Sequence, residues 1–189
     1  MTRIVAGSVG GRRIEVPRGG TRPTSERVRE ALFARLGHYG VLDGARVLDL
    51  CAGSGALGLE AASRGATDVT LVDSSRAATA VCARNTRCLG LRGVRVVTAK
   101  VVPFLAGVAG APVELVLLDP PYHLPEADLA AMLAPLVRAR DPWLAPTGVV
   151  VVERSSRTPE PTWPAGLGRL AHRRYGETVL WFAAPAGEG

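Results

Sequence analysis

Between residues 45 and 153, short apolar runs alternate with stretches of helical spacing. Strands that alternate with helices of this length form βαβ units, whose right-handed crossovers give a mostly parallel sheet with helices on both faces. The sequence therefore predicts an α/β fold. The expected strands are residues 46–50, 69–73, 94–97, 113–118 and 148–153, and the expected helices lie near residues 57–64, 76–89, 102–106 and 126–140.

Further elements are expected on both sides of this alternating region. Apolar runs at residues 169–171 and 178–183 predict an antiparallel hairpin at the sheet edge, which brings the sheet to seven strands. Two short β-like runs at residues 3–6 and 13–16 predict a small N-terminal hairpin. Residues 25–37 have helical spacing, with a capping residue at the start and a glycine at the end.

These elements suggest a division of the chain into three parts. We expect an N-terminal hairpin and helix extension over residues 1–40, a main α/β domain over residues 41–184 and a flexible tail over residues 185–189. No segment has the length and apolarity of a membrane span or the pattern of a signal peptide, so a cytoplasmic protein is expected.

A glycine-rich loop directly follows the strand expected at residues 46–50. Glycines at positions 53, 55 and 58 allow a tight turn, a close approach of the backbone to a ligand, and close packing of a helix on a strand. About 20 residues later, Asp73 ends the next strand, where an acidic side chain can bind two ribose hydroxyls. The loop follows a strand and opens a helix, and it therefore predicts a nucleotide-type cofactor site.

Asp49, just before this loop, distinguishes between two cofactor classes. A dinucleotide would account for the glycines and Asp73, but a carboxylate at position 49 would repel a pyrophosphate and attract an ammonium group. S-adenosylmethionine has a cationic methionine end and no phosphate. The chain also has few residues left for the substrate domain of a dehydrogenase, so S-adenosylmethionine is the expected cofactor.

The strand expected at residues 113–118 ends in the turn Asp119-Pro120-Pro121-Tyr122. Proline fixes φ and restricts the residue before it, so the Asp119 side chain, the Pro120 carbonyl and the Tyr122 ring are held in a rigid arrangement. Two hydrogen-bond acceptors and an aromatic face suit a flat group with an exocyclic amine, such as a nucleobase. The turn alone is also compatible with an ordinary solvated strand end.

The net charge of +6 is concentrated at the N-terminus. Residues 1–40 hold eight arginines and three glutamates. Codon bias explains why nearly all basic residues are arginine, but it does not explain their clustering. A basic end joined to a nearly neutral body indicates docking to a polyanion, and nucleic acid is the commonest one.

Neither a metal site nor a disulfide framework is expected. The cysteines at positions 51, 82 and 88 and the histidines at positions 38, 123 and 172 lack the spacing of zinc ligands. The cysteines are therefore interpreted as small core residues.

Taken together, these motifs resemble the class I S-adenosylmethionine-dependent methyltransferases, whose fold is Rossmann-like. The resemblance is closest to the bacterial family that methylates one guanine N2 in 16S ribosomal RNA of the small subunit, and it covers roughly residues 3–183. The residues that carry it are Gly11-Arg12-Arg13, Thr21-Arg22-Pro23-Thr24, Arg27 to Phe33, Val47 to Gly55, Ala56 to Ala61, Ser63 to Ala66 and Asp119 to Tyr122.

The resemblance implies S-adenosylmethionine as cofactor, 16S rRNA in an assembled or nearly assembled 30S subunit as partner, and a monomer. The family usually places Asp or Asn after the third strand to receive the adenine amine. Here Lys100 stands there, so backbone contacts at Val101 are expected instead. The implied cofactor residues are Asp49, Cys51, Ala52, Gly53, Ser54, Gly55, Gly58, Asp73, Ser74, Lys100, Val101 and Asp119.

The resemblance also implies a methyl-acceptor site formed by Asp119, Pro120, Pro121 and Tyr122. The residues expected to contact RNA are Arg12, Arg13, Arg22, Thr24, Arg27 and Tyr122. Two other functions remain open, because similar turns serve any planar amine. One is a methyltransferase for DNA adenine or protein glutamine, and the other is a non-catalytic RNA-binding ribosome assembly factor.

Overall fold

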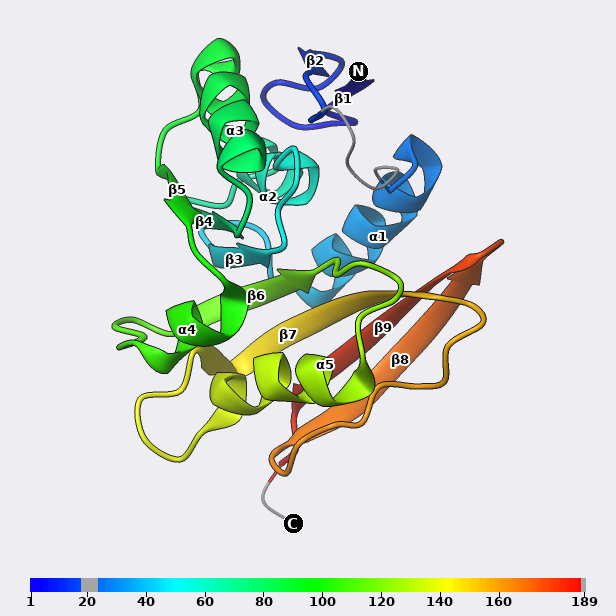
Figure 1. Cartoon of the computed structure of the whole chain (residues 1–189). Helices are drawn as coiled ribbons and strands as arrows, with labels where there is room; N and C mark the ends of the chain where they lie inside the picture. The colour runs from blue at the N-terminus through cyan, green and yellow to red at the C-terminus, as the bar shows by residue number, and fades with distance from the viewer. Residues whose placement is uncertain (18–23, 188–189) are drawn as a thin grey trace.

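The computed structural model describes residues 1–17 and 24–187 and is built on one seven-stranded sheet (Figure 1). The strand order is β5-β4-β3-β6-β7-β9-β8, with β3 to β7 parallel and β9 antiparallel to both of its neighbours. This topology confirms the predicted α/β fold with an antiparallel edge hairpin. The strands are β3 (Arg46–Leu50), β4 (Asp68–Asp73), β5 (Val94–Thr98), β6 (Val113–Leu118), β7 (Leu144–Ser155), β8 (Leu167–Tyr175) and β9 (Thr178–Pro185).

Helices cover both faces of the sheet because its central strands are apolar on both sides. Leu115 and Leu117 of β6 pack in the cluster that holds α1, α2 and α3, whereas Val116 and Leu118 pack with α4 and α5 on the opposite face. Side chains alternate along a strand, so a continuous apolar run fills two layers at once. The helices are α1 (Glu26–Tyr39), α2 (Ala56–Ser63), α3 (Arg76–Leu89), α4 (Val101–Ala106) and α5 (Glu126–Leu133).

Several element bounds differ from those expected. The helix predicted over residues 126–140 ends at Leu133 and continues as a 3₁₀ turn, Ala134–Val137, because Pro135 at its start has no N–H to donate. β7 starts at Leu144 rather than at residue 148, and a register shift against β6 accommodates its first residues. β9 extends to Pro185, the first residue of the predicted tail, and residues 188–189 lie outside the described chain.

Two further differences concern the length of β8 and the exposure of one cysteine. β8 spans nine residues instead of three, because an edge strand can expose polar side chains that hide its strand pattern. Cys82 is buried, as expected of a core residue, but Cys88 on the last turn of α3 is exposed. The described helices include none long and apolar enough to cross a membrane.

The N-terminal segment packs against the main sheet domain. Its strands β1 (Thr2–Arg3) and β2 (Arg13–Ile14) are shorter than predicted, yet Ile4 and Ile14 belong to the same core cluster as α1 and the sheet. The buried carboxylate of Glu60 on α2 accepts hydrogen bonds from the N–H groups of Val5 and Ala6, at 2.6 and 3.0 Å. The hairpin backbone that carries Arg3, Arg12 and Arg13 is therefore fixed on the domain.

Gly7 allows the closest part of this contact. Its φ of +87° favours glycine, and a Cβ there would lie 2.0 Å from the carbonyl oxygen of Ser63. The neighbouring Ser8 N–H donates to that same carbonyl at 2.7 Å. The backbone of the hairpin thus lies directly on the end of α2.

Glu60→Ala is predicted to lower the free energy of unfolding by about 3 kcal/mol, because it leaves two backbone donors and the Arg64 guanidinium without their buried acceptor. Urea unfolding followed by circular dichroism would measure the change. The exposed Glu30→Ala serves as control and should change stability by less than about 0.5 kcal/mol. Equal effects of the two substitutions would contradict this role of Glu60.

Candidate functional site

Three aspartates meet at the carboxyl edge of the sheet. Asp49 lies in β3, Asp73 ends β4 and Asp119 follows β6, and β3 lies between the other two strands. All three carboxyl groups lie close enough to the Cys51 thiol to affect its pKa. Burial is the largest cause that raises this pKa to about 12, and the charges of Asp73, Asp49 and Asp119 raise it further. The topology thus creates a local concentration of negative charge where strand order reverses, which is where open α/β sheets bind ligands.

The glycine loop wraps closely around this edge. Gly53 and Gly55 have φ values of +58° and +79°, which favour glycine. A Cβ on Gly58 would lie 2.3 Å from Leu71 Cδ2 and 3.0 Å from Asp49 Oδ2, so only glycine allows α2 to begin this close to the strands. The loop residues from Cys51 to Gly58 therefore lie together as the sequence predicts.

Asp49 is buried, and only one of its two carboxyl oxygens accepts a hydrogen bond from a described residue. Its Oδ2 accepts the Gly58 N–H at 2.8 Å, whereas its Oδ1 has no partner among the described residues. Burial raises the pKa of Asp49 to about 7, and the nearby Asp73 adds to the shift. A buried carboxyl oxygen without a donor is a candidate binding position for a cationic or hydrogen-bonding group. An ammonium group fits this requirement.

Asp73 shapes the loop and also faces outward. Its Oδ2 accepts the Gly53 N–H and its Oδ1 accepts the Ser75 N–H, both at 2.8 Å. Each carboxylate oxygen has a second lone pair, and Asp73 is half-buried beside the exposed Ser74, so hydroxyl donors can still reach it. The described residues include no group of three or more His, Cys, Asp or Glu placed to hold a metal ion.

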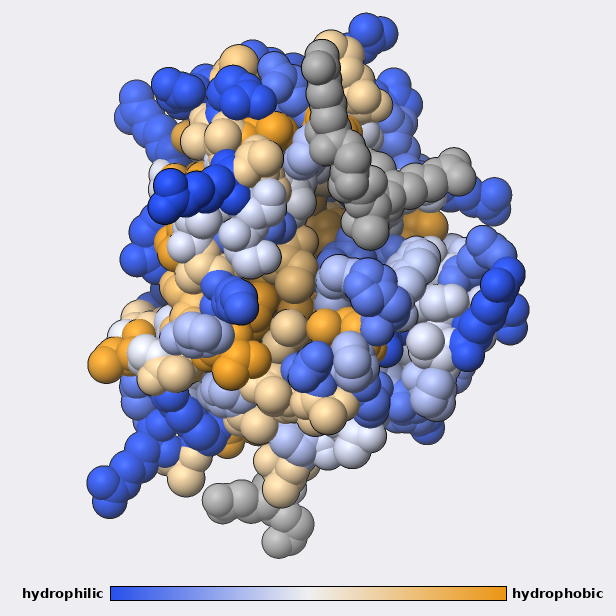
Figure 2. Space-filling model, viewed as in Figure 1, coloured by the Kyte–Doolittle hydropathy of each residue, from blue (hydrophilic) through white to orange (hydrophobic). Residues whose placement is uncertain are grey.

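The position expected to contact adenine lies where β5 leads into α4. Lys100 is exposed at the start of α4, and the first helical residue, Val101, is buried. The neighbouring Ala99 N–H donates to the Asp73 carbonyl at 3.0 Å, which places this turn next to the end of β4. Figure 2 shows the molecule from the same side as Figure 1, and on this side apolar residues gather across the middle with hydrophilic residues around them. Val102 of α4 is among the exposed large hydrophobic side chains.

A cavity of about 440 Å³ lies next to Asp119. It is lined by the whole predicted turn, Asp119 to Tyr122, and by residues from α1, β7 and the β8–β9 hairpin. Tyr122 is 48% exposed, and its hydroxyl lies 3.4 Å from Thr178 Oγ1. The volume of the cavity is within the range of small-molecule sites, so the cavity can admit a single base.

Two residues from distant segments complete this cavity. The Thr24 hydroxyl donates to Glu153 Oε2 at 2.7 Å and lies 3.4 Å from Asp119 Oδ2. Burial is the largest cause of a raised pKa for both carboxyl groups, and the charge of Glu153 raises the pKa of Asp119 further. Thr24, predicted to contact RNA, therefore lies in the acceptor cavity. Glu153 was missed, and its only sequence signal is a charged residue at the end of an apolar run.

The predicted RNA-contacting arginines have different surroundings. Arg12 donates to the carbonyls of Leu89, at 3.0 Å, and Cys88 at the end of α3, so it holds the hairpin in place. Arg13 and Arg27 are exposed, and Arg22 lies outside the described residues. These positions leave Arg13 and Arg27 available to a ligand.

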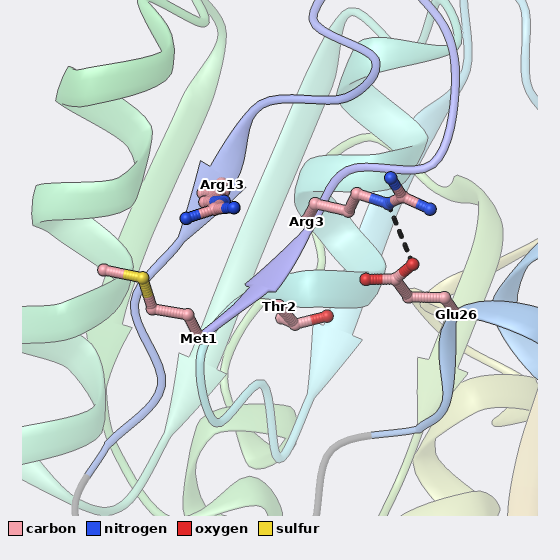
Figure 3. Close-up of a pocket in the computed structure, with 5 residues that line it drawn as sticks. All are labelled: Met1, Thr2, Arg3, Arg13 and Glu26. Atoms are coloured by element: carbon pink, nitrogen blue, oxygen red, sulfur yellow. Dashed lines mark hydrogen bonds and ion pairs between the residues drawn. The ribbon is translucent and has the colours of Figure 1, made fainter.

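A second cavity, of about 290 Å³, lies between the hairpin and the first turn of α1. Figure 3 shows Arg3 extending to Glu26, with which it forms a 2.8 Å ion pair, while Arg13 projects from the neighbouring strand. Both partners of this ion pair are well exposed, so it contributes little to stability. The arginines of the hairpin thus lie at the surface of an otherwise packed segment.

Comparisons with known proteins cover nearly the whole chain. A family model described as Conserved hypothetical protein 95 matches residues 2–184. The chain is 36% identical over 184 residues to ribosomal RNA small subunit methyltransferase D of Escherichia coli K12, a match that covers 92% of this chain and 88% of that protein. The solved structure of the Escherichia coli methyltransferase yhhF has a TM-score of 0.83 at 34% identity and covers 98% of both chains.

A second solved structure, a protein of Thermus thermophilus, gives a TM-score of 0.81 at 31% identity. It covers 98% of this chain and 100% of its own. The likeness therefore extends over nearly the whole chain.

The stability of the free protein is predicted to fall as pH rises from about 4 to about 7, because Asp49 keeps its proton in the folded chain after the unfolded chain has lost it. One such proton contributes at most about 1.4 kcal/mol per pH unit. Urea unfolding at several pH values would measure the slope. Asp49→Asn should reduce the slope, although the raised pKa values of Asp119 and Glu153 keep part of it. An identical slope in both proteins would show that Asp49 does not titrate in this range.

Proposed function

The chain belongs to the family of ribosomal RNA small subunit methyltransferase D, and we propose that it methylates the exocyclic N2 amine of one guanine in 16S rRNA. The family membership confirms the resemblance drawn from the residues. The observation that carries the proposal is the cavity that joins the Asp119–Tyr122 turn to Glu153 and Thr24, next to the aspartates of the glycine loop.

The residues around the glycine loop fit S-adenosylmethionine. This cofactor supplies an electrophilic methyl group on a sulfonium. The unpartnered Oδ1 of Asp49 suits its ammonium group, and Asp73 can accept ribose hydroxyls. The backbone at Lys100 and Val101 lies beside the end of β4, where the adenine would be expected. A ligand with net positive charge is favoured at this edge, because it would stabilise the ionised forms of carboxyl groups that burial otherwise keeps protonated.

Positioning is the main task of the acceptor turn. A guanine amine is a weak nucleophile, since its lone pair is delocalised into the ring. Asp119 and the Pro120 carbonyl would accept its two hydrogens, which holds the nitrogen in line with the methyl group and directs its lone pair forward. Tyr122, which is 48% exposed at the cavity, would stack on the base. A base held in this way has to be unpaired or flipped out of its helix.

The proposed substrate is 16S rRNA within an assembled or nearly assembled small subunit, in the cytoplasm, with the enzyme acting as a monomer. The name of the Escherichia coli relative supports small-subunit RNA as the target. The exposed arginines at positions 13 and 27 provide positive charge on the N-terminal face. A methyl-transfer assay that compares 16S rRNA, small subunits, DNA and protein tests the proposal, and preferred transfer to DNA or protein would refute it.

Asp119→Ala is predicted to lower kcat for methyl transfer by about 100-fold, because one acceptor for the amine hydrogens is lost. Calorimetry should show the affinity for S-adenosylhomocysteine within about threefold of wild type, since the cofactor's main contacts remain. Asp128→Ala, an exposed position on α5, serves as the charge-loss control. Transfer by Asp119→Ala near the wild-type rate would refute the acceptor role.

Replacing Arg13 and Arg27 together by alanine is predicted to weaken binding to small subunits and to reduce the slope of log K against log salt by about two. Point substitutions suit this test better than removal of the hairpin, because the hairpin packs in the core. Filter binding at several salt concentrations measures the slope. The control is Arg140→Ala, an exposed arginine outside the N-terminal segment, and an equal change in both proteins would contradict a specific basic face.

A further inference from the structure

The acceptor cavity contains a second carboxyl group that the proposed reaction does not use. Glu153 is only 4% exposed and lines the same cavity as Asp119. Leu118 of β6 and Val152 of β7 pair in parallel register, so Asp119 and Glu153 follow them at the same level on adjacent strands. The site thus presents two carboxyl groups, one beside the other, to whatever enters it.

Thr24 orients this second group. Its hydroxyl donates to Oε2 of Glu153 at 2.7 Å, and the Tyr122 hydroxyl also lies close enough to stabilise the charged form of Glu153. A carboxylate has about four lone-pair sites, so Glu153 can still accept a hydrogen bond from a ligand. The Thr24 hydroxyl lies 3.4 Å from Asp119 Oδ2, so one side chain, from the segment just before α1, contacts both carboxyl groups. Burial of Glu153 raises its pKa, whereas hydrogen bonds from Thr24 and Tyr122 lower it, so a further donor in the cavity would stabilise the carboxylate form.

The purine bases differ in what they offer to such a pair. Guanine has a ring N1–H next to its N2 amine, and therefore presents three donor hydrogens on one edge. Asp119 and the Pro120 carbonyl can accept two of them, which leaves the N1–H for a third acceptor. Adenine instead has a ring N1 acceptor next to its amine, and a lone pair facing a buried carboxylate is unfavourable.

We propose that Glu153 accepts a hydrogen bond from the ring N1–H of the target base and thereby selects guanine. This inference rests on the proposed function and goes further, because the Asp119–Tyr122 turn alone fits any planar amine. Glu153 acts here as a specificity residue, with Thr24 as the positioning residue that fixes its carboxylate.

The test uses small subunits reconstituted with 16S rRNA that carries either guanine or 2-aminopurine at the methylated nucleotide. 2-Aminopurine keeps the N2 amine but has an acceptor at N1. Wild-type enzyme should prefer guanine by about 100-fold in kcat/KM, the effect of losing a hydrogen bond to a buried charged group. In Glu153→Gln the amide can donate to N1 of 2-aminopurine, so the preference should fall below about tenfold.

Three results would separate the possible failures. A Glu153→Gln enzyme that loses activity on both bases in parallel would show a merely structural role and overturn the inference. Equal kcat/KM of the wild-type enzyme on the two bases would also overturn it, even if the variant does not fold. No transfer to either substrate by the wild-type enzyme would instead refute the proposed function. Glu30→Gln, on the exposed face of α1, is the matched control and should keep the wild-type preference.

Discussion

The position of β3 between β4 and β6 determines where everything else in the site can lie. The loop after β3 leads to α2 on one face of the sheet, and the loop after the adjacent β6 leads to α5 on the other face, so the two loops diverge and leave room for a ligand. Asp49, Asp73 and Asp119 all come from these three strands. The cofactor loop and the acceptor turn are therefore neighbours because of strand order, although about 60 residues separate them in the sequence.

Burial of the carboxyl groups at this edge destabilises their charged forms in the free protein. Burial raises the pKa values of Asp49, Asp119 and Glu153, and the protein has to keep protons on them or supply donors. An ammonium group at Asp49 and the amine and ring hydrogens of a guanine at Asp119 and Glu153 are donors of the required kind. The substrates proposed here would thus relieve an electrostatic strain that the fold creates, which gives a physical reason for binding both.

The sequence was sufficient to predict the sheet, and parallel pairing then places two of the proposed site residues. Asp73 and Asp119 each end a continuous apolar run, so their places at the carboxyl edge follow from parallel pairing. Glu153 ends such a run too, but its proximity to Asp119 depends on the register of β6 and β7, which no local pattern reveals. The charge pattern also cannot distinguish exposed arginines from buried ones. Arg29 is fully buried and donates to the Arg3 carbonyl at 2.7 Å.

The most direct test of the account is to identify the nucleoside that this enzyme modifies. Small subunits from cells that lack the enzyme would be incubated with purified protein and S-adenosylmethionine labelled in its methyl group, and the 16S rRNA then digested and separated by mass spectrometry. We expect the label in N2-methylguanosine at one nucleotide per subunit. Label in a methylated adenosine, in ribosomal protein, or in no product at all would contradict it.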